Sequence, residues 1–125
     1  MRTFFQSGLL AVSVSIFGCA TRTPTAVEDS ARAKYILVAA LEAWKDGQVK
    51  SLSSRTPPIR FADDDQRAGL ILVDYGFKNE EAGIKPFQDV PIVLLLRNRD
   101  GRTLTKTAAY QVAVDPVLTV LRSDN

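Results

Sequence analysis

Few side chains in this 125-residue sequence can do chemistry, because it contains no histidine and only one cysteine, Cys19. Without histidine, the chain lacks the commonest general base, the usual metal ligand and the usual partner of a nucleophilic serine or cysteine. A single cysteine forms no internal disulfide and no thiolate metal site by itself. The net charge is only +2, and no basic stripe is interleaved with aromatic residues, so we expect no nucleic-acid partner.

The densest group of carboxylates is the run Asp63-Asp64-Asp65. Calcium favours clustered carboxylates, but consecutive aspartates do not match the alternate spacing of an EF-hand loop, and no glutamate follows at the ligand distance. We therefore expect a solvent-exposed turn that caps a short helix before Arg67. Nothing else in the sequence predicts a metal site, and we expect no cofactor.

Cys19 stands at the end of a largely apolar, uncharged segment that runs from Phe4 to Phe17, after a single basic residue, Arg2. About 20 residues are needed to span a bilayer, and this run is shorter, so residues 1–18 are predicted to be a signal peptide. The segment Ile16-Phe17-Gly18-Cys19 resembles the bacterial lipobox, which implies that the cysteine is lipidated and becomes the new N-terminus. The alternatives are an ordinary signal peptide with a cysteine near its cleavage site, or a buried helix of the mature fold.

Lipidation implies an exported protein of the cell envelope. Residues 19–25 would then be the lipidated cysteine and a short polar tether, and the lipid on Cys19 would make the membrane a partner. One acyl chain anchors weakly, so a multiply acylated cysteine is what holds a domain at a membrane. In a Gram-negative host, Ala20 after the cysteine resembles lipoproteins of the outer membrane, on its periplasmic side.

Residues 26–125 are predicted to form one α+β domain. Apolar residues recur every three or four positions from Val27 to about Gln48, which predicts a helix that Gly47 ends. Val49 to Ser54 is expected to be a linker or a short extra turn. Strands are predicted at Pro57–Phe61, Leu70–Phe77, Val90–Arg97, Thr103–Asp115 and Val117–Arg122, with a hairpin turn at Asn98–Arg102. The expected architecture is one long N-terminal helix packed on a curved antiparallel sheet of four to five strands.

This organisation resembles the cystatin-like and nuclear transport factor 2-like superfold. The segments LEAWKDGQ, PPIRFADDD, AGLILVDY and DPVLTVLR resemble those of a group of small uncharacterised bacterial lipoproteins. The resemblance covers about Ala33 to Arg122 and implies a sheet that curls around the helix. It does not fix an activity, because the superfold hosts isomerases, dehydratases, peptidase inhibitors and association domains. The segment from Gln111 to Asp115 begins like the Q-x-V-x-G loop of cystatins but departs from it at two positions.

Three aromatic residues are the candidates for lining a pocket in the concave face of such a sheet: Trp44, Tyr75 and Tyr110. An enzyme similar to a steroid isomerase would need a carboxylate base beside a phenol. Asp74 and Tyr75 are neighbours in a predicted strand and point to opposite faces, so they do not share a pocket. Tyr75 and Tyr110 are expected on one face, where core packing is the simpler interpretation, and Trp44 is in register with the apolar side of the helix.

We therefore expect a membrane-anchored, non-catalytic binding or association domain. The outer face of the Thr103–Asp115 strand carries Thr103, Thr105, Thr107 and Gln111. Such a face suits contact with a second copy, which would form a homodimer, or with another envelope protein. The alternative is a small-molecule enzyme of the steroid-isomerase or dehydratase type that uses a pocket in the concave face. A concave face filled by the helix would count against that pocket.

Overall fold

A computed structural model describes residues 26–79 and 83–124. Helix α1 (Ala26–Lys45) is confirmed where its apolar spacing predicted it. Its most deeply buried side chains recur every three or four residues: Ala33, Ile36, Leu37, Ala40, Leu41 and Trp44. Gly47 has a φ of +71° and donates its N–H to the carbonyl of Trp44, so glycine ends the helix as expected.

Three short elements follow α1 in the chain: η1 (Val49–Ser54), β1 (Ile59–Ala62) and α2 (Asp64–Arg67). The η1 turn is a 3-10 helix that buries Leu52. Asp63 caps α2, because its carboxylate accepts hydrogen bonds from the N–H groups of Asp65 (2.8 Å) and Gln66 (3.0 Å). The predicted cap is thus confirmed, but the prediction of a solvent-exposed turn is wrong for Asp63, which is only 1% exposed.

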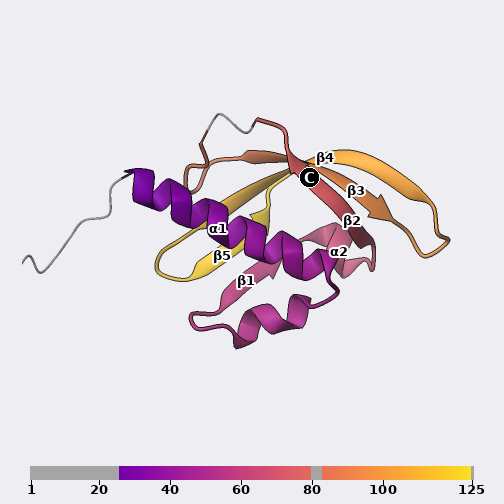
Figure 1. Ribbon diagram of the computed structural model, residues 1–125, viewed down its shortest axis with the longest axis horizontal. Coiled ribbons are helices and arrows are strands. Elements are labelled where there is room, and N and C mark those ends of the chain that lie inside the picture. Colours follow the sequence, from indigo (N-terminus) through magenta and orange to yellow (C-terminus); the bar gives the residue numbers. More distant parts are fainter. Residues whose placement is uncertain (1–25, 80–82, 125) are drawn as a thin grey trace, which may run out of the picture.

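The sheet has five strands in the order β1-β5-β4-β3-β2. The four further strands are β2 (Ile71–Phe77), β3 (Val90–Arg97), β4 (Thr103–Ala113) and β5 (Leu118–Arg122). All neighbours are antiparallel except β1 and β5, which run parallel. The sheet curls into a half-barrel and α1 lies across its concave face (Figure 1). The predicted fold class, α+β with an N-terminal helix on a curved sheet, is confirmed.

The concave face of the sheet is filled by side chains rather than open. Six inward-facing residues of β3 and β4 are at most 1% exposed: Ile92, Leu94, Leu96, Ala108, Tyr110 and Val112. They form one hydrophobic core with the buried side of α1. A bulge between Leu72 and Asp74 shifts the register of β2, so that both Leu72 and Tyr75 lie opposite inward-facing residues of β3.

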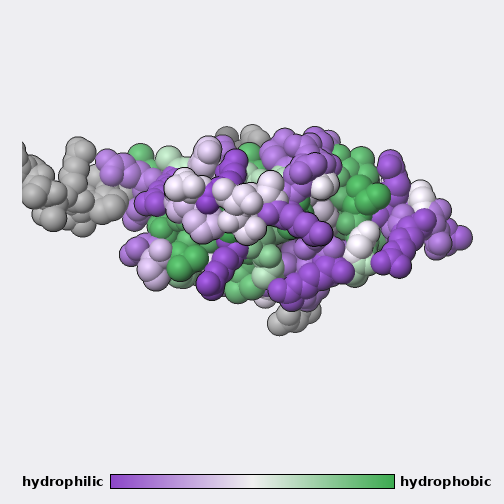
Figure 2. Space-filling model, turned by 90° about the horizontal axis from the view of Figure 1, so that it is seen from below, coloured by the Kyte–Doolittle hydropathy of each residue, from purple (hydrophilic) through white to green (hydrophobic). Residues whose placement is uncertain are grey.

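The convex outer face of the sheet carries the alternate residues of the same strands. Its centre is uncharged and half-buried to exposed: Val93, Leu95, Thr105, Thr107 and Ala109. Elsewhere, large apolar side chains reach the surface at separate positions, among them Tyr35, Phe87 and Leu121. Figure 2 shows this scatter on one face, where hydrophobic surface appears in separate places bordered by hydrophilic residues.

Candidate functional site

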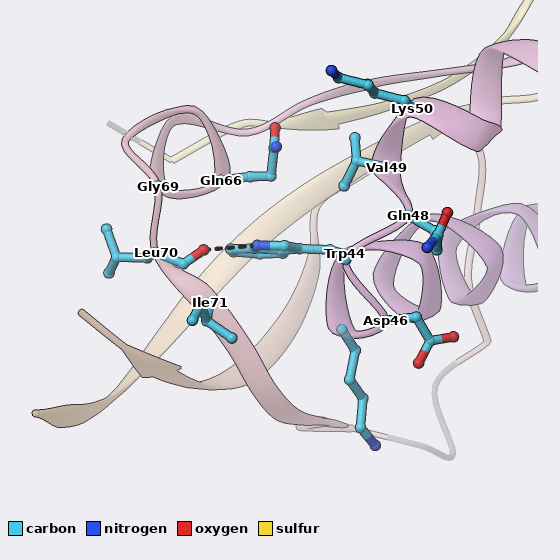
Figure 3. A pocket seen from close by; sticks show the side chains of 11 residues that line it. Trp44, Asp46, Gln48, Val49, Lys50, Gln66, Gly69, Leu70 and Ile71 are labelled. Atoms are coloured by element: carbon cyan, nitrogen blue, oxygen red, sulfur yellow. Dashed lines mark hydrogen bonds between the residues drawn. The ribbon is translucent and has the colours of Figure 1, made fainter. Parts of the chain in front are cut away.

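An open groove of about 660 Å³ lies at the carboxyl end of α1. One wall is the connection from α1 to η1, and the other is the segment that joins α2 to β2 (Figure 3). The side chains that shape it include Trp44, Gln48, Val49, Lys50, Gln66 and Ile71.

Trp44 forms the floor of this groove rather than a free platform. Its indole N–H donates a hydrogen bond to the carbonyl oxygen of Leu70 (3.0 Å), which ties α1 to the start of β2. The ring is 4% exposed and packs at 6.1 Å from the ring of Phe61. In Figure 3 the side chains of Val49 and Gln66 lie on one side of the indole plane and that of Ile71 on the other. The predicted core role of Trp44 is therefore confirmed.

The rim of the groove is polar but contains no catalytic pair. Gln48, Lys50 and Gln66 offer amide and ammonium groups, and Lys45 lies 3.5 Å from the carboxylate of Asp74. These groups can hold a ligand by hydrogen bonds over an apolar floor. No nucleophile paired with a base is present among the residues that line it.

The α2 wall of the groove is anchored by the buried carboxylate of Asp63. Besides capping α2, this carboxylate accepts a hydrogen bond from the hydroxyl of Tyr110 on β4. Nη1 of Arg122, at the end of β5, lies 3.2 and 3.3 Å from its two oxygens. The side chain of Asp63 is 0% exposed and that of Arg122 is 7% exposed. Such burial of a charge is tolerated because the carboxylate is paired and its hydrogen bonds are satisfied.

Two further carboxylates complete this network around Arg122. Asp65 accepts from Nη1 of Arg122 and from Nζ of Lys106, each at 2.9 Å. Asp124 accepts from Nε of Arg122 and from the backbone N–H of Ala109. We call the whole set the ion-pair network: Asp63, Asp65, Lys106, Tyr110, Arg122 and Asp124. It joins α2 to β4 and β5.

Contacts within the network shift the pKa values of several of its members. Burial alone would favour the neutral acid of Asp65, but the hydrogen bonds from Lys106 and Arg122 outweigh it and lower the pKa of Asp65. Burial also opposes the charge on Arg122, whose pKa is nevertheless raised by the bonds to Asp124 and Asp65. Burial, and then the hydrogen bond to the Asp63 carboxylate, raise the pKa of Tyr110 well above its usual value.

Tyr75 is held separately, by α1. Its hydroxyl donates a hydrogen bond of 2.7 Å to the carboxylate of Glu42, in a position open to solvent. Partial burial and this carboxylate raise the pKa of Tyr75. The bond fixes the edge strand β2 to the last turn of the helix.

The three aromatic candidates therefore do not meet in one pocket. Tyr75 and Tyr110 face the same side of the sheet as predicted, but each hydroxyl has its own carboxylate partner. Trp44 and Tyr110 hold the two ends of a single segment, because Tyr110 bonds Asp63 before α2 and Trp44 bonds Leu70 after it. All three residues act in this structure as cross-links between the helix, the sheet and the α2 segment.

The sequence analysis did not identify Asp63 and Arg122 as partners, although a pattern in the sequence points to the role of each. Asp63 and Gln66 have the spacing of a capping box, which marks the start of a helix. Arg122 follows the buried Leu118 and Val120 at two-residue steps, so alternation along β5 already points its side chain inward. An inward-pointing arginine requires a buried carboxylate, and Asp63 supplies it.

Cys19 and the predicted tether lie outside the described residues, so the predicted lipidation stays a prediction. Within residues 26–79 and 83–124, no helix has the length and apolar character needed to cross a membrane. The same residues contain no cluster of three or more potential metal-ligating side chains.

No protein-family model matches this chain, and no curated protein or solved structure matches it significantly.

Proposed function

We propose that this protein is an exported lipoprotein of the cell envelope, anchored by a lipid on Cys19, whose α+β domain binds or associates rather than catalyses. In a Gram-negative host the anchor would lie on the periplasmic side of the outer membrane. The observation that carries the non-catalytic part is the filled concave face. Trp44, Tyr75 and Tyr110, the residues best suited to line a pocket there, all make cross-links within the fold.

The Asp63–Tyr110 contact supports the same conclusion. A carboxylate beside a phenol is the pairing that an isomerase of this superfold would need. Here the side chain of Asp63 is 0% exposed, Tyr110 is 0% exposed, and the carboxylate already accepts bonds from α2 and Arg122. A substrate would reach neither group without displacing the ion-pair network.

The outer face of the sheet is the surface we propose for association, with a second copy of this chain as its partner. Its centre presents uncharged side chains from two neighbouring strands: Val93 and Leu95 from β3, and Thr105, Thr107 and Ala109 from β4. A two-fold dimer contact places a surface against itself, so a charged centre would meet like charges. An uncharged centre avoids that repulsion.

Native mass spectrometry of the exported, mature protein tests both parts of the proposal. The mass of the N-terminal peptide reports whether Cys19 begins the chain and carries acyl groups, and Cys19→Ala should abolish both. For association, the wild type should give a dimer that increases with concentration. Thr107→Arg, which puts a charge at the centre of the outer face, should give only monomer. Ser54→Arg, an exposed position on η1, is the matched control and should keep the dimer.

The experiment can contradict the lipid anchor and the dimer separately. An unmodified N-terminus that retains residues 1–18 would overturn the anchor and leave the association open. A monomer at every concentration would overturn the dimer, and so would a dimer that Thr107→Arg leaves unchanged. A small-molecule adduct that survives mild activation would favour the enzyme or pocket alternative instead.

A further inference from the structure

Four arginines gather at the end of the molecule where β3 turns into β4. Arg97, Arg99 and Arg102 belong to this hairpin, and Arg67 ends α2. All four are exposed. Figure 1 shows the hairpin projecting at the end of the molecule opposite the start of α1. We call this set the arginine tip.

The turn that carries the tip has a defined geometry. The side-chain carbonyl of Asn98 accepts hydrogen bonds from the N–H groups of Asp100 and Arg102, each at 2.9 Å. The backbone N–H of Asn98 bonds the carbonyl of Arg102, and Gly101 supplies the positive φ of +83°. The turn is therefore closed by its own hydrogen bonds and presents its arginines from a fixed backbone.

Arg99 links the hairpin to the α2 segment. Its guanidinium lies over Gly69, where a Cβ atom would come within 3.1 Å of Nη2. Gly69 has a φ of +92° and follows Arg67 by two residues. This contact brings the end of α2 beside the hairpin and so gathers Arg67 with the other three arginines.

The arginines of the tip lack partners of opposite charge. Within the described part of the chain, none of the four guanidinium groups forms an ion pair or a hydrogen bond, in contrast to Arg122 and its three carboxylates. The acidic residues nearest in sequence are Asp100 in the hairpin and Asp65 in α2. Neither pairs with these arginines, because Asp65 pairs with Lys106 and Arg122 instead. The tip therefore keeps an excess of positive charge facing solvent.

Two exposed apolar side chains flank the arginines. Ile71, the first residue of β2, lies opposite Arg97 in the sheet and is 50% exposed. Leu104, two residues after Arg102, is 38% exposed. A projecting turn that combines unpaired arginines with apolar side chains has the composition of a membrane-surface contact.

We propose that the arginine tip binds the headgroups of anionic phospholipids. Guanidinium groups bind phosphate oxygens in a bidentate manner, and the flanking Ile71 and Leu104 can enter the headgroup layer. A bilayer surface yields to a projecting turn and needs no complementary groove, which a folded protein partner would need. The inference goes beyond the proposed lipid anchor: it concerns a second contact with a bilayer, made by the opposite end of the domain.

The test places a fluorescent probe on the hairpin of the mature, exported protein. An environment-sensitive nitrobenzoxadiazole dye is attached at Asp100→Cys, or at Ser54→Cys on η1 as a control position. The protein is mixed with vesicles of phosphatidylcholine alone or with 30% phosphatidylglycerol. We expect a blue shift and brighter emission for the hairpin probe on the anionic vesicles only, reversed by high salt because surface charge is screened. The η1 probe should not respond.

Charge variants distinguish binding by the arginine tip from the general attraction of a basic protein to anionic vesicles. In the Asp100→Cys background, Arg97→Gln/Arg99→Gln/Arg102→Gln removes three charges from the tip. Lys50→Gln/Arg55→Gln/Arg60→Gln removes three from exposed positions on the η1 side, where no ion pair is lost. Each arginine near an anionic surface contributes about fivefold in affinity, so the contact between the tip and the surface should weaken on the order of 100-fold, and the hairpin probe of the tip variant should lose its response. The control should retain the response of the wild-type tip to within a few-fold.

Equal emission on both kinds of vesicle would overturn the proposal, and so would a tip variant whose hairpin probe responds as strongly as that of its control. A tip that responds to an acidic protein but not to the vesicles would also overturn it. The mass of the labelled protein counts acyl groups, so loss of the anchor is seen separately. If Cys19 proves to be unmodified, Cys19→Ser keeps a single dye and the vesicle comparison is unchanged.

Discussion

Replacing Tyr110 with phenylalanine tests whether the ion-pair network holds the fold together. The substitution keeps the buried ring and removes only the hydroxyl that donates to the carboxylate of Asp63. Asp63 would remain buried and paired with Arg122, with one hydrogen bond fewer. Hydrogen bonds to charged groups contribute about 1.5–3 kcal/mol, and the carboxylate keeps its bonds from α2 and Arg122. We expect the free energy of unfolding to fall by about 2 kcal/mol.

Urea unfolding followed by circular dichroism measures this loss. With a slope of about 1.5 kcal/mol per molar urea, the midpoint should fall by roughly 1.3 M. Tyr75→Phe is the matched control, because it removes a similar hydroxyl–carboxylate bond that is open to solvent. Its effect should stay within about 0.5 kcal/mol, as for most surface changes. Equal effects of the two substitutions would refute the structural role assigned to the network.

The pH dependence gives a second, independent test of Tyr110. Burial and the Asp63 carboxylate raise its folded-state pKa above the value of 10.0 expected for an unfolded tyrosine. The stability it contributes is therefore fully present below pH 10 and declines as the unfolded state begins to ionise above it. The difference in free energy of unfolding between the wild type and Tyr110→Phe should decrease above pH 10, by about 1.4 kcal/mol per pH unit. A difference in free energy that stays constant up to pH 11 would contradict the hydrogen bond between Tyr110 and Asp63.

Three other perturbations test neighbouring contacts by the same unfolding measurement. Gly69→Ala should destabilise the fold by about 1–2 kcal/mol, because φ is +92° there and the new Cβ would press on Arg99; adding Arg99→Ala should relieve only part of this loss. Trp44→Phe should cost about 1–3 kcal/mol, since the carbonyl of Leu70 loses its indole donor and the smaller ring leaves a gap. Asp65 has a lowered folded-state pKa, so its contribution is present above the unfolded value of 3.8 and is lost as pH falls through the folded one. The stability of Asp65→Asn should therefore vary less with pH below about 4 than that of the wild type.

The elements themselves were predictable because their patterns are local. Apolar spacing of three and four residues marks α1, and the predicted Val90–Arg97 strand coincides with β3. Residue types with special backbone preferences set the boundaries, such as Gly47 after the helix and Gly101 in the hairpin turn. These signals depend only on residues that are close in the sequence, so they can be recognised without knowledge of the fold.

Pairings between distant segments were not predictable in the same way. Nothing near Ile59–Ala62 shows that β1 will run parallel to β5, because that pairing depends on the path of the chain through η1 and around the helix. The burial of Asp63 has the same origin. A run of three aspartates looks solvated until Arg122, 59 residues later, is brought against it by the β1–β5 pair. Local polarity was a misleading guide because the compensating charge is remote in sequence.

The arginines of this domain fall into two groups: Arg122, which stabilises the fold, and the arginines of the tip, which we propose to bind a membrane. Arg122 is nearly buried and surrounded by carboxylates, and its removal would leave Asp63 charged and unpaired inside the protein. The arginines of the tip are exposed and unpaired, and their removal should leave the fold intact. The two sets meet at α2: Asp63 fixes its start, and Arg99 rests on Gly69 just beyond its end. The network therefore sets the position of Arg67 at the end of α2, whereas the three hairpin arginines are presented by a turn that its own hydrogen bonds close.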